Sequence, residues 1–132
     1  MSSPPLFLVL CSGEHEKLQM AGMMASVAAV SERPVQVFVS MNAIYAFRKD
    51  VSADQRYKGG AFSDLMKEKN APDAVELFHQ GKMLGDMKMH PCSMALDITE
   101  WSEDDLVEDL FDEPLGLTKF LADAEAGQIV VL

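Results

Sequence analysis

The sequence predicts an α/β protein of three layers, with a mainly parallel sheet of about five strands flanked by helices. Short apolar runs alternate with longer segments of helical pattern, and no repeat or low-complexity tract interrupts them. The first run, residues 6–10 (LFLVL), has no polar alternation, which is typical of a strand covered on both faces. A chain of 132 residues is the size of one domain, which we expect to span residues 1–132.

A helix is predicted over residues 14–32. Glu14 and Glu16 suit its first turn, where acidic side chains interact favourably with the helix dipole. One face carries small side chains that permit close packing on a sheet: Leu18, Ala21, Gly22, Ala25, Ala28 and Ala29. Four larger apolar side chains extend this face: Met20, Met24, Val27 and Val30. Because the resulting apolar arc is wide for a helix with one side in water, we expect another subunit to cover part of it.

The middle of the chain is predicted to contain a strand, a loop and two helical segments. Residues 34–41 (PVQVFVSM) form the second strand, and residues 48–60 are a polar loop that ends in two glycines. Arg48, Lys49, Arg56 and Lys58 make this loop basic, and long loops in compact proteins are often functional. Residues 63–85 are helical but interrupted at 70–72, where Pro72 suits the start of a new helix.

The last third of the chain is predicted to add two strands and three helical pieces. Residues 86–92 (DMKMHPC) are a third strand, and residues 93–101 a short helix. Residues 102–111 (SEDDLVEDLF) begin with a partial capping box, Ser102 and Asp105, and are interpreted as a solvated helix. A final helix over 116–127 leads into the closing strand, residues 128–132.

The net charge of −10 is concentrated in the C-terminal third. Residues 1–90 hold ten acids and ten bases, whereas residues 91–132 hold eleven acids and one base, Lys119. Such a surface repels nucleic-acid phosphates and anionic membranes, so we expect neither partner. It either keeps the protein soluble as a solvated face or docks a basic partner.

Two cysteines do not form a disulfide scaffold, and the apolar run near the N-terminus is too short for a signal peptide or a membrane span. We therefore expect a cytoplasmic protein, because thiols stay reduced in that compartment.

Both cysteines follow predicted strands, at the edge of the sheet where α/β proteins collect ligands. Cys11 ends the first strand, and Cys92 ends the third strand and precedes a predicted helix, whose N-terminus favours a thiolate. His90 lies two residues before Cys92, on the same side of an extended segment, and an imidazolium there would stabilise the thiolate. Pro91, between them, removes one backbone donor and bends the strand. The sequence therefore does not define whether His90 reaches the Cys92 sulfur. The alternative is that Cys92 is a small apolar packing residue.

Other chemistry has little support in the sequence. His90 and Cys92 with His79 or Cys11 are a conceivable zinc set, but their spacing is irregular and no CxxC or HxxxH occurs. No phosphate-binding loop, dinucleotide fingerprint or serine nucleophile motif is present. We therefore expect no cofactor and no metal.

The chain resembles the DsrE/DsrF-like family, which includes YchN-like proteins and the TusBCD-type sulfur-relay subunits. Three segments carry the resemblance: LFLVLCSGEHEKLQMAGMMASVAAV, VQVFVSMNAIYAF and MKMHPCSMALDI, the last of which contains the cysteine. The end of the chain, LVEDLFDEPLGLTKFLADAEAGQIVVL, is similar to the family's closing helix and strand. The resemblance covers nearly the whole chain and implies a flavodoxin-like arrangement.

The resemblance implies sulfur handling without a cofactor. In sulfur-relay members the cysteine at the position of Cys92 holds sulfane sulfur as a persulfide and passes it to a partner protein. Such members assemble as trimers or hexamers, here expected to be homo-oligomers with a sulfur donor and a sulfur acceptor as partners. His90 is the expected neighbour that tunes Cys92, and Cys11 is a possible second thiol. The alternative is a non-catalytic oligomeric binding or scaffold protein in which Cys92 only packs.

Overall fold

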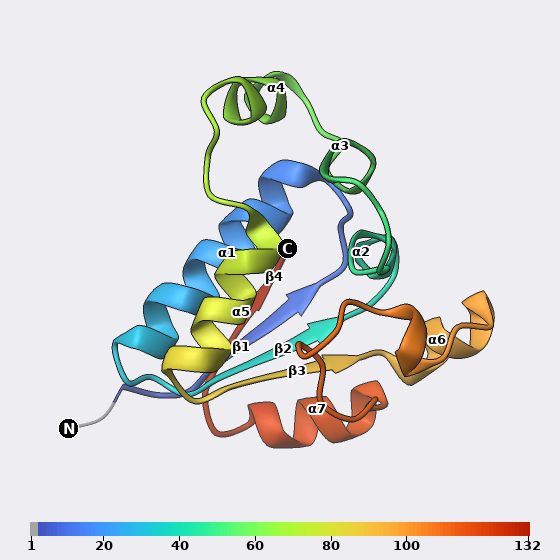
Figure 1. Ribbon diagram of the computed structural model, residues 1–132. Helices are drawn as coiled ribbons and strands as arrows, with labels where there is room; N and C mark the ends of the chain where they lie inside the picture. Colours follow the sequence, from blue (N-terminus) through green and yellow to red (C-terminus); the bar gives the residue numbers. More distant parts are fainter. Residues whose placement is uncertain (1–2) are drawn as a thin grey trace.

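The computed structural model describes residues 3–132, and within them it contains one parallel four-stranded sheet with the strand order β3-β2-β1-β4 (Figure 1). The strands are β1 (Leu6–Leu10), β2 (Val35–Val39), β3 (Met87–Pro91) and β4 (Gln128–Val131). The helices are α1 (His15–Val30), α2 (Ala43–Ala46), α3 (Ala53–Arg56), α4 (Ala61–Glu68), α5 (Ala74–Leu84), α6 (Ser93–Thr99) and α7 (Leu117–Ala124). The predicted α/β class is confirmed, with four strands where about five were expected.

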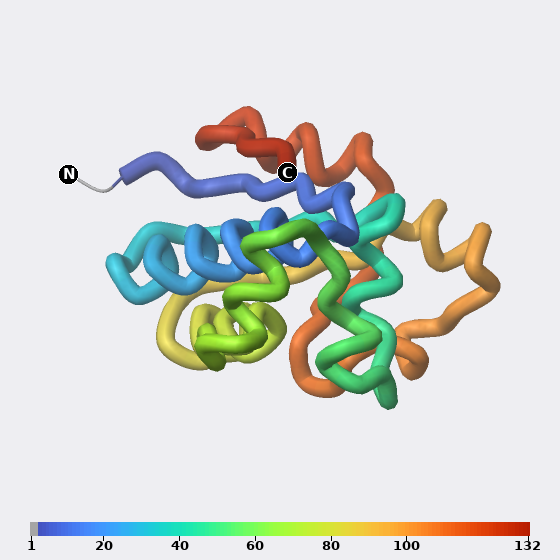
Figure 2. Tube along the Cα trace, turned by 90° about the horizontal axis from the view of Figure 1, so that it is seen from above, coloured from blue at the N-terminus to red at the C-terminus, as the bar shows by residue number. Residues whose placement is uncertain are grey.

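The molecule has three layers. Helices α1 and α5 lie side by side on one face of the sheet, and α7 lies on the other face (Figures 1 and 2). Because both faces are covered, β1 is apolar on both of its sides: Leu8 and Phe7 are both buried although they point in opposite directions. This coverage explains why the LFLVL run shows no polar alternation.

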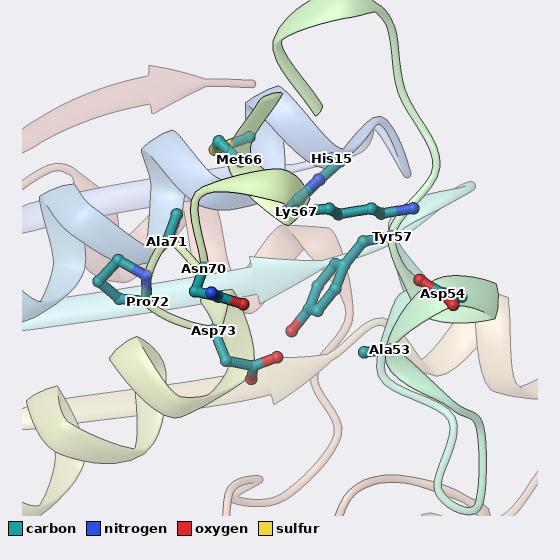
Figure 3. A pocket seen from close by; sticks show the side chains of 10 residues that line it. All are labelled: His15, Ala53, Asp54, Tyr57, Met66, Lys67, Asn70, Ala71, Pro72 and Asp73. Atoms are coloured by element: carbon teal, nitrogen blue, oxygen red, sulfur yellow. The ribbon is translucent and has the colours of Figure 1, made fainter. Parts of the chain in front are cut away.

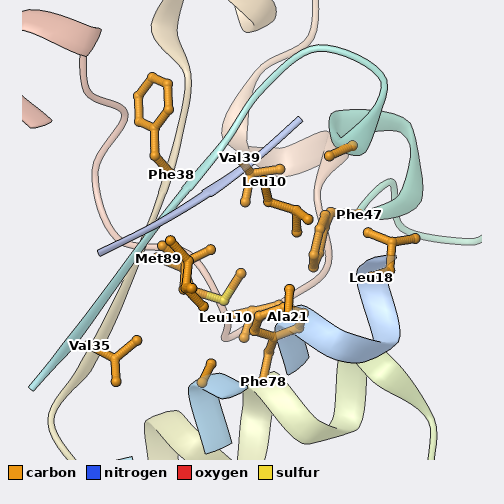
Figure 4. Packing of buried hydrophobic residues seen from close by; sticks show 14 of the residues in the cluster. Leu10, Leu18, Ala21, Val35, Phe38, Val39, Phe47, Phe78, Met89 and Leu110 are labelled. Atoms are coloured by element: carbon orange, nitrogen blue, oxygen red, sulfur yellow. The ribbon is translucent and has the colours of Figure 1, made fainter. Parts of the chain in front are cut away.

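The core divides between the two faces of the sheet. Val35, Val39 and Phe78 of α5 belong to the buried cluster on one face, whereas Phe38 points to the opposite face (Figure 4). There Phe120 of α7 lies with its ring centroid 5.1 Å from that of Phe38 and is fully buried. Since α7 has only eight residues, this ring is its main buried contact with the sheet. Truncating Phe120 to alanine would lower the free energy of unfolding by about 3–5 kcal/mol.

Small residues set the close approach of α1 and α5. A Cβ atom on Gly22 would lie 3.1 Å from the carbonyl oxygen of Ala74, and one on Gly81 would lie 3.3 Å from Cα of Ser26. The predicted small-residue face of α1 is therefore confirmed as its buried face, since those six residues are all buried. The exposed side of α1 carries Met20, Met23, Val27 and Val30.

Two segments differ from their predicted structure. Residues 48–60 were predicted as a loop but contain the single-turn helix α3, which Ser52 caps through the backbone N–H of Gln55. Residues 102–111 form only a short 3-10 helix, η1 (Glu103–Asp105), with the predicted capping box of Ser102 and Asp105. A longer helix would place like charges four residues apart, Asp105 against Asp109, which is unfavourable.

Candidate functional site

Cys92 lies at the carboxyl edge of the sheet, directly after β3 and before the first residue of α6. Its backbone N–H donates to the carbonyl oxygen of Val39 at 2.8 Å, and the next N–H, of Ser93, donates to Leu115 at 2.9 Å. These bonds hold the start of α6 against β2 and against the segment before α7. Cys92 is only 5% exposed, and the helix α6 that follows it has seven residues.

The two cysteines flank a buried serine on one rung of the sheet. The registers that pair Leu10 with Val39 and Val39 with Pro91 continue for one residue, which aligns Cys11, Ser40 and Cys92. The N–H of Ser40 donates to Leu10 at 2.9 Å, as this continuation requires. Burial raises the pKa of the Cys11 thiol, and the charge of a nearby Cys92 thiolate raises it further. The structure therefore places both predicted thiols at the same sheet edge, with β2 between them.

His90 is held by a different part of the chain. Its Nδ1 atom lies 2.8 Å from the carbonyl oxygen of Glu113 and 3.7 Å from the Glu113 carboxylate, and the side chain is 3% exposed. His90 lies in β3 and Cys92 directly follows the last residue of that strand, so the alternation of an extended segment puts both on the same side.

Pro91 occupies a position where no backbone donor is needed. β3 is an edge strand, and the N–H groups of Met89 and Cys92 show the alternation along it: the first points outward to Asp112 and the second inward to Val39. The nitrogen of Pro91 therefore faces outward, where proline is tolerated in a sheet. Its carbonyl oxygen accepts the N–H of Leu115 at 3.1 Å.

Residues 112–115 cover the outer edge of β3. The Asp112 carboxylate accepts the N–H of Met89 at 2.9 Å and pairs with the Lys82 ammonium of α5 at 2.6 Å. Burial opposes ionisation of Asp112, but the hydrogen bonds from Lys82 and Met89 outweigh it, so the pKa of this carboxyl is lowered. Sequence reasoning missed this segment, because no local pattern links Asp112 to a strand more than twenty residues earlier.

A cleft lies at the N-terminal end of α1, between α3 and α4 (Figure 3). The buried His15 ring stacks on Tyr57 at 4.6 Å, and its Nδ1 atom lies 2.6 Å from the Ser63 hydroxyl. Burial and the Lys67 ammonium lower the pKa of His15, so the imidazole is neutral at pH 7. The cleft has a volume of about 220 Å³, which is below the roughly 300–1,000 Å³ of typical ligand sites.

The basic residues of the 48–60 segment do not gather at Cys92. The Arg56 guanidinium donates to the carbonyl oxygens of Ala46, Arg48 and Val51, and thereby folds the segment on itself. Arg48 lies over the Trp101 ring at 5.3 Å.

Within residues 3–132 no group of three or more histidine, cysteine or acidic side chains is arranged to hold a metal ion. In the same range, none of the helices combines the length and the apolar character needed to cross a bilayer.

Comparison with known proteins identifies the family. The model of the DsrE/DsrF/DrsH-like family matches residues 55–132, which include His90 and Cys92 but not Cys11. No curated protein is significantly similar to the chain. A solved structure from Methanobacterium thermoautotrophicum, described as the protein of unknown function MTH1491, shares the fold with a TM-score of 0.65 at 13% identity, over 98% of this chain and 100% of that one. The family model matches more than half of the residues of this chain. The chain therefore belongs to the DsrE/DsrF/DrsH-like family.

Proposed function

We propose that the protein is a cytoplasmic sulfur carrier that holds a persulfide on Cys92 and passes sulfane sulfur to a partner protein. The observation that carries the proposal is the position of Cys92: it lies at the carboxyl edge of a parallel sheet, inside the part of the chain that matches the family. The whole chain acts as one domain in this proposal, which is supported by the structural match over 98% of its length.

The proposed transfer needs no cofactor and no net oxidation. The Cys92 thiolate attacks the outer sulfur of a persulfide donor, the donor's S–S bond breaks, and the donor leaves as a thiolate. An acceptor thiolate then attacks the outer sulfur now carried by Cys92, and Cys92 leaves as a thiolate. His90 is proposed to favour the thiolate form in both steps.

Mass spectrometry tests this proposal. Treatment of the native protein with polysulfide should add about 32 Da to the peptide that contains Cys92, because one sulfur atom is gained. The adduct should disappear in Cys92→Ser and persist in Cys11→Ser. If Cys92 carries no added sulfur in a folded protein under excess donor, the proposal is wrong.

The burial of Cys92 favours a second candidate function, a non-catalytic oligomeric binding or scaffold protein. A side chain that is 5% exposed is a good packing residue, and free cysteine is commonly one. Thiol titration separates the two candidates: Cys92 should react in the native state if it carries sulfur, and only after unfolding if it packs.

We also propose that the chain forms a homotrimer or hexamer. The support is the exposed apolar row on α1 and the exposed side chains Ile129 and Val131 of the edge strand β4. Light scattering after size-exclusion chromatography measures the assembly. A Val27→Glu variant should dissociate it, whereas Met83→Glu, an equal change on the exposed side of α5, should not.

A further inference from the structure

An apolar cleft lies between α2 and α6, the helix that begins at the residue after Cys92. It is lined by Met41, Asn42, Ile44, Tyr45, Met94, Ala95, Ile98 and Thr99. Its volume of about 160 Å³ is well below the roughly 300–1,000 Å³ of sites for small molecules. Because α6 begins at the residue after Cys92, a protein side chain held in this cleft would contact the helix that directly follows the thiol.

The cleft is surrounded by exposed apolar side chains. Ile98 is 72% exposed and Met41 and Tyr45 are each 57% exposed, although all three line one small hollow. A group of exposed large apolar residues marks an interaction surface more often than a chance feature, whereas isolated ones are ordinary. This surface is separate from the exposed row on α1.

The surroundings of the cleft are acidic. Asp97 and Glu100, both exposed, flank the last two lining residues of α6. The residues that follow α6 in the chain line a groove of about 360 Å³. Its lining includes the acids Glu103, Asp104, Glu108 and Asp109 and one base, Lys49. Two-fold pairing of this face with a second copy would bring like charges together, whereas a basic partner would be attracted.

We propose that the cleft and its acidic rim dock a basic protein that inserts an apolar side chain and presents a cysteine to Cys92. This inference rests on the proposed function and specifies the acceptor. The acceptor thiolate attacks the outer sulfur of the Cys92 persulfide, the S–S bond breaks, and Cys92 leaves as a thiolate, so that no oxidant or reductant is consumed.

Two synthetic cysteine peptides of equal length test the proposal. One carries leucine and several arginines near its cysteine, and the other carries leucine and several glutamates. The rate of sulfur transfer from the persulfidated protein to each peptide is followed by mass spectrometry. The basic peptide should react at least about tenfold faster at low salt, and the ratio should fall towards one in about 0.5 M salt, because screening removes steering.

Variants with matched controls locate the docking surface. Asp97→Lys with Glu100→Lys should remove most of the preference for the basic peptide. Glu68→Lys with Glu76→Lys makes the same charge change at exposed acids of α4 and α5 and should preserve it. Ile98→Ser should slow transfer to both peptides, and Met83→Ser, which changes an exposed side chain on α5, should not.

Equal rates for the two peptides, or equal losses in the test and control variants, would overturn the docking proposal.

Loading of Cys92 is measured before any peptide is added, so failure of the proposed function is seen separately. If Cys92 does not load, binding of a fluorescent basic peptide with serine in place of cysteine tests docking alone: binding lost in Ile98→Ser supports the surface, and no binding refutes it. If Ile98→Ser instead dissociates an oligomer, a second copy covers the cleft and the proposal is wrong.

Discussion

The His90 imidazole donates its Nδ1–H to the carbonyl oxygen of Glu113, 2.8 Å away, across the outer edge of β3. A carbonyl oxygen only accepts hydrogen bonds, so this contact assigns the proton to Nδ1. The covering segment 112–115 thus fixes the orientation of a buried ring that stands two residues from Cys92.

His90→Gln should slow the loading of Cys92 with sulfur by roughly tenfold if the imidazole favours the thiolate, since an opposite charge nearby stabilises the ionised form. The measurement is the loading rate across pH 5–9 (about the range in which thiols and imidazoles titrate). Lys88→Gln, on the same face of β3 but exposed, is the control. An unchanged pH profile in a folded His90→Gln protein would mean that His90 is only structural.

Cys11 and Cys92 should not form a disulfide within one chain. They share a rung but are separated by β2, so their Cα atoms are roughly 9.6 Å apart, two strand spacings. A disulfide needs Cα atoms within about 7 Å. Mild oxidation followed by digestion should therefore yield no peptide pair joining them, and Cys11→Ser should load sulfur at the wild-type rate. Recovery of that cross-link from the monomer would contradict the register.

Asp112→Asn should destabilise the fold by about 1–2 kcal/mol at pH 7, because it weakens the bonds to Lys82 and Met89. The folded-state pKa of Asp112 is lowered, so its contribution is present above the unfolded value of 3.8 and is lost as pH falls through the folded value. Urea unfolding from pH 7 to pH 3 should show the two proteins converging at low pH. Asp123→Asn, which breaks the exposed pair with Lys119, should cost at most about 0.5 kcal/mol.

Gly85→Ala should destabilise the fold by about 2–3 kcal/mol. Its Cβ atom would lie 2.3 Å from the backbone carbonyl oxygen of Ala29, so α1 or the turn after α5 would have to shift. At Gly116 the nearest atom to an added Cβ, the Ser93 hydroxyl, is 3.9 Å away. Gly116→Ala should therefore cost clearly less in the same thermal or urea unfolding experiment, and equal losses would disprove the close approach.

His15→Gln should make stability less sensitive to mild acid. Burial and Lys67 lower the folded pKa of His15 below its usual 6.5, so the unfolded chain takes up a proton first as pH falls. The wild-type free energy of unfolding should then decrease between about pH 7 and pH 5, by at most about 1.4 kcal/mol per pH unit for one proton. His79→Gln, a matched change on α5, controls for the substitution. An equally steep decrease in His15→Gln would refute the role of this imidazole.

Much of the fold follows from local patterns in the sequence. The uninterrupted run LFLVL indicates a strand covered on both faces, and the small side chains of α1 indicate its buried face. The break at 70–72 separates α4 from α5, with Asp73 capping α5 through the N–H of Glu76. The same patterns place Cys92 at a junction of strand and helix. In each case the pattern that indicates the element lies within the element itself or within a few residues of it.

The segment 102–111 shows where local patterns fail. Leu106 and Leu110, four residues apart, are typical of a helix, and both are fully buried. However, they lie in an irregular segment, where the N–H of Val107 donates to Phe47 and the carbonyl oxygen of Leu110 accepts from Lys82. Contacts with distant elements replace the helical hydrogen bonds that the sequence pattern predicted.

Local sequence patterns predict the α/β class, the small-residue face of α1 and the placement of both cysteines at the ends of strands. They do not reveal that Pro91 faces outward from an edge strand, that His90 bonds to Glu113, that Cys92 is buried or that β2 separates it from Cys11. Side-chain periodicity and turn chemistry act over a few residues, whereas strand order, edge coverage and burial depend on segments that meet only when the chain folds.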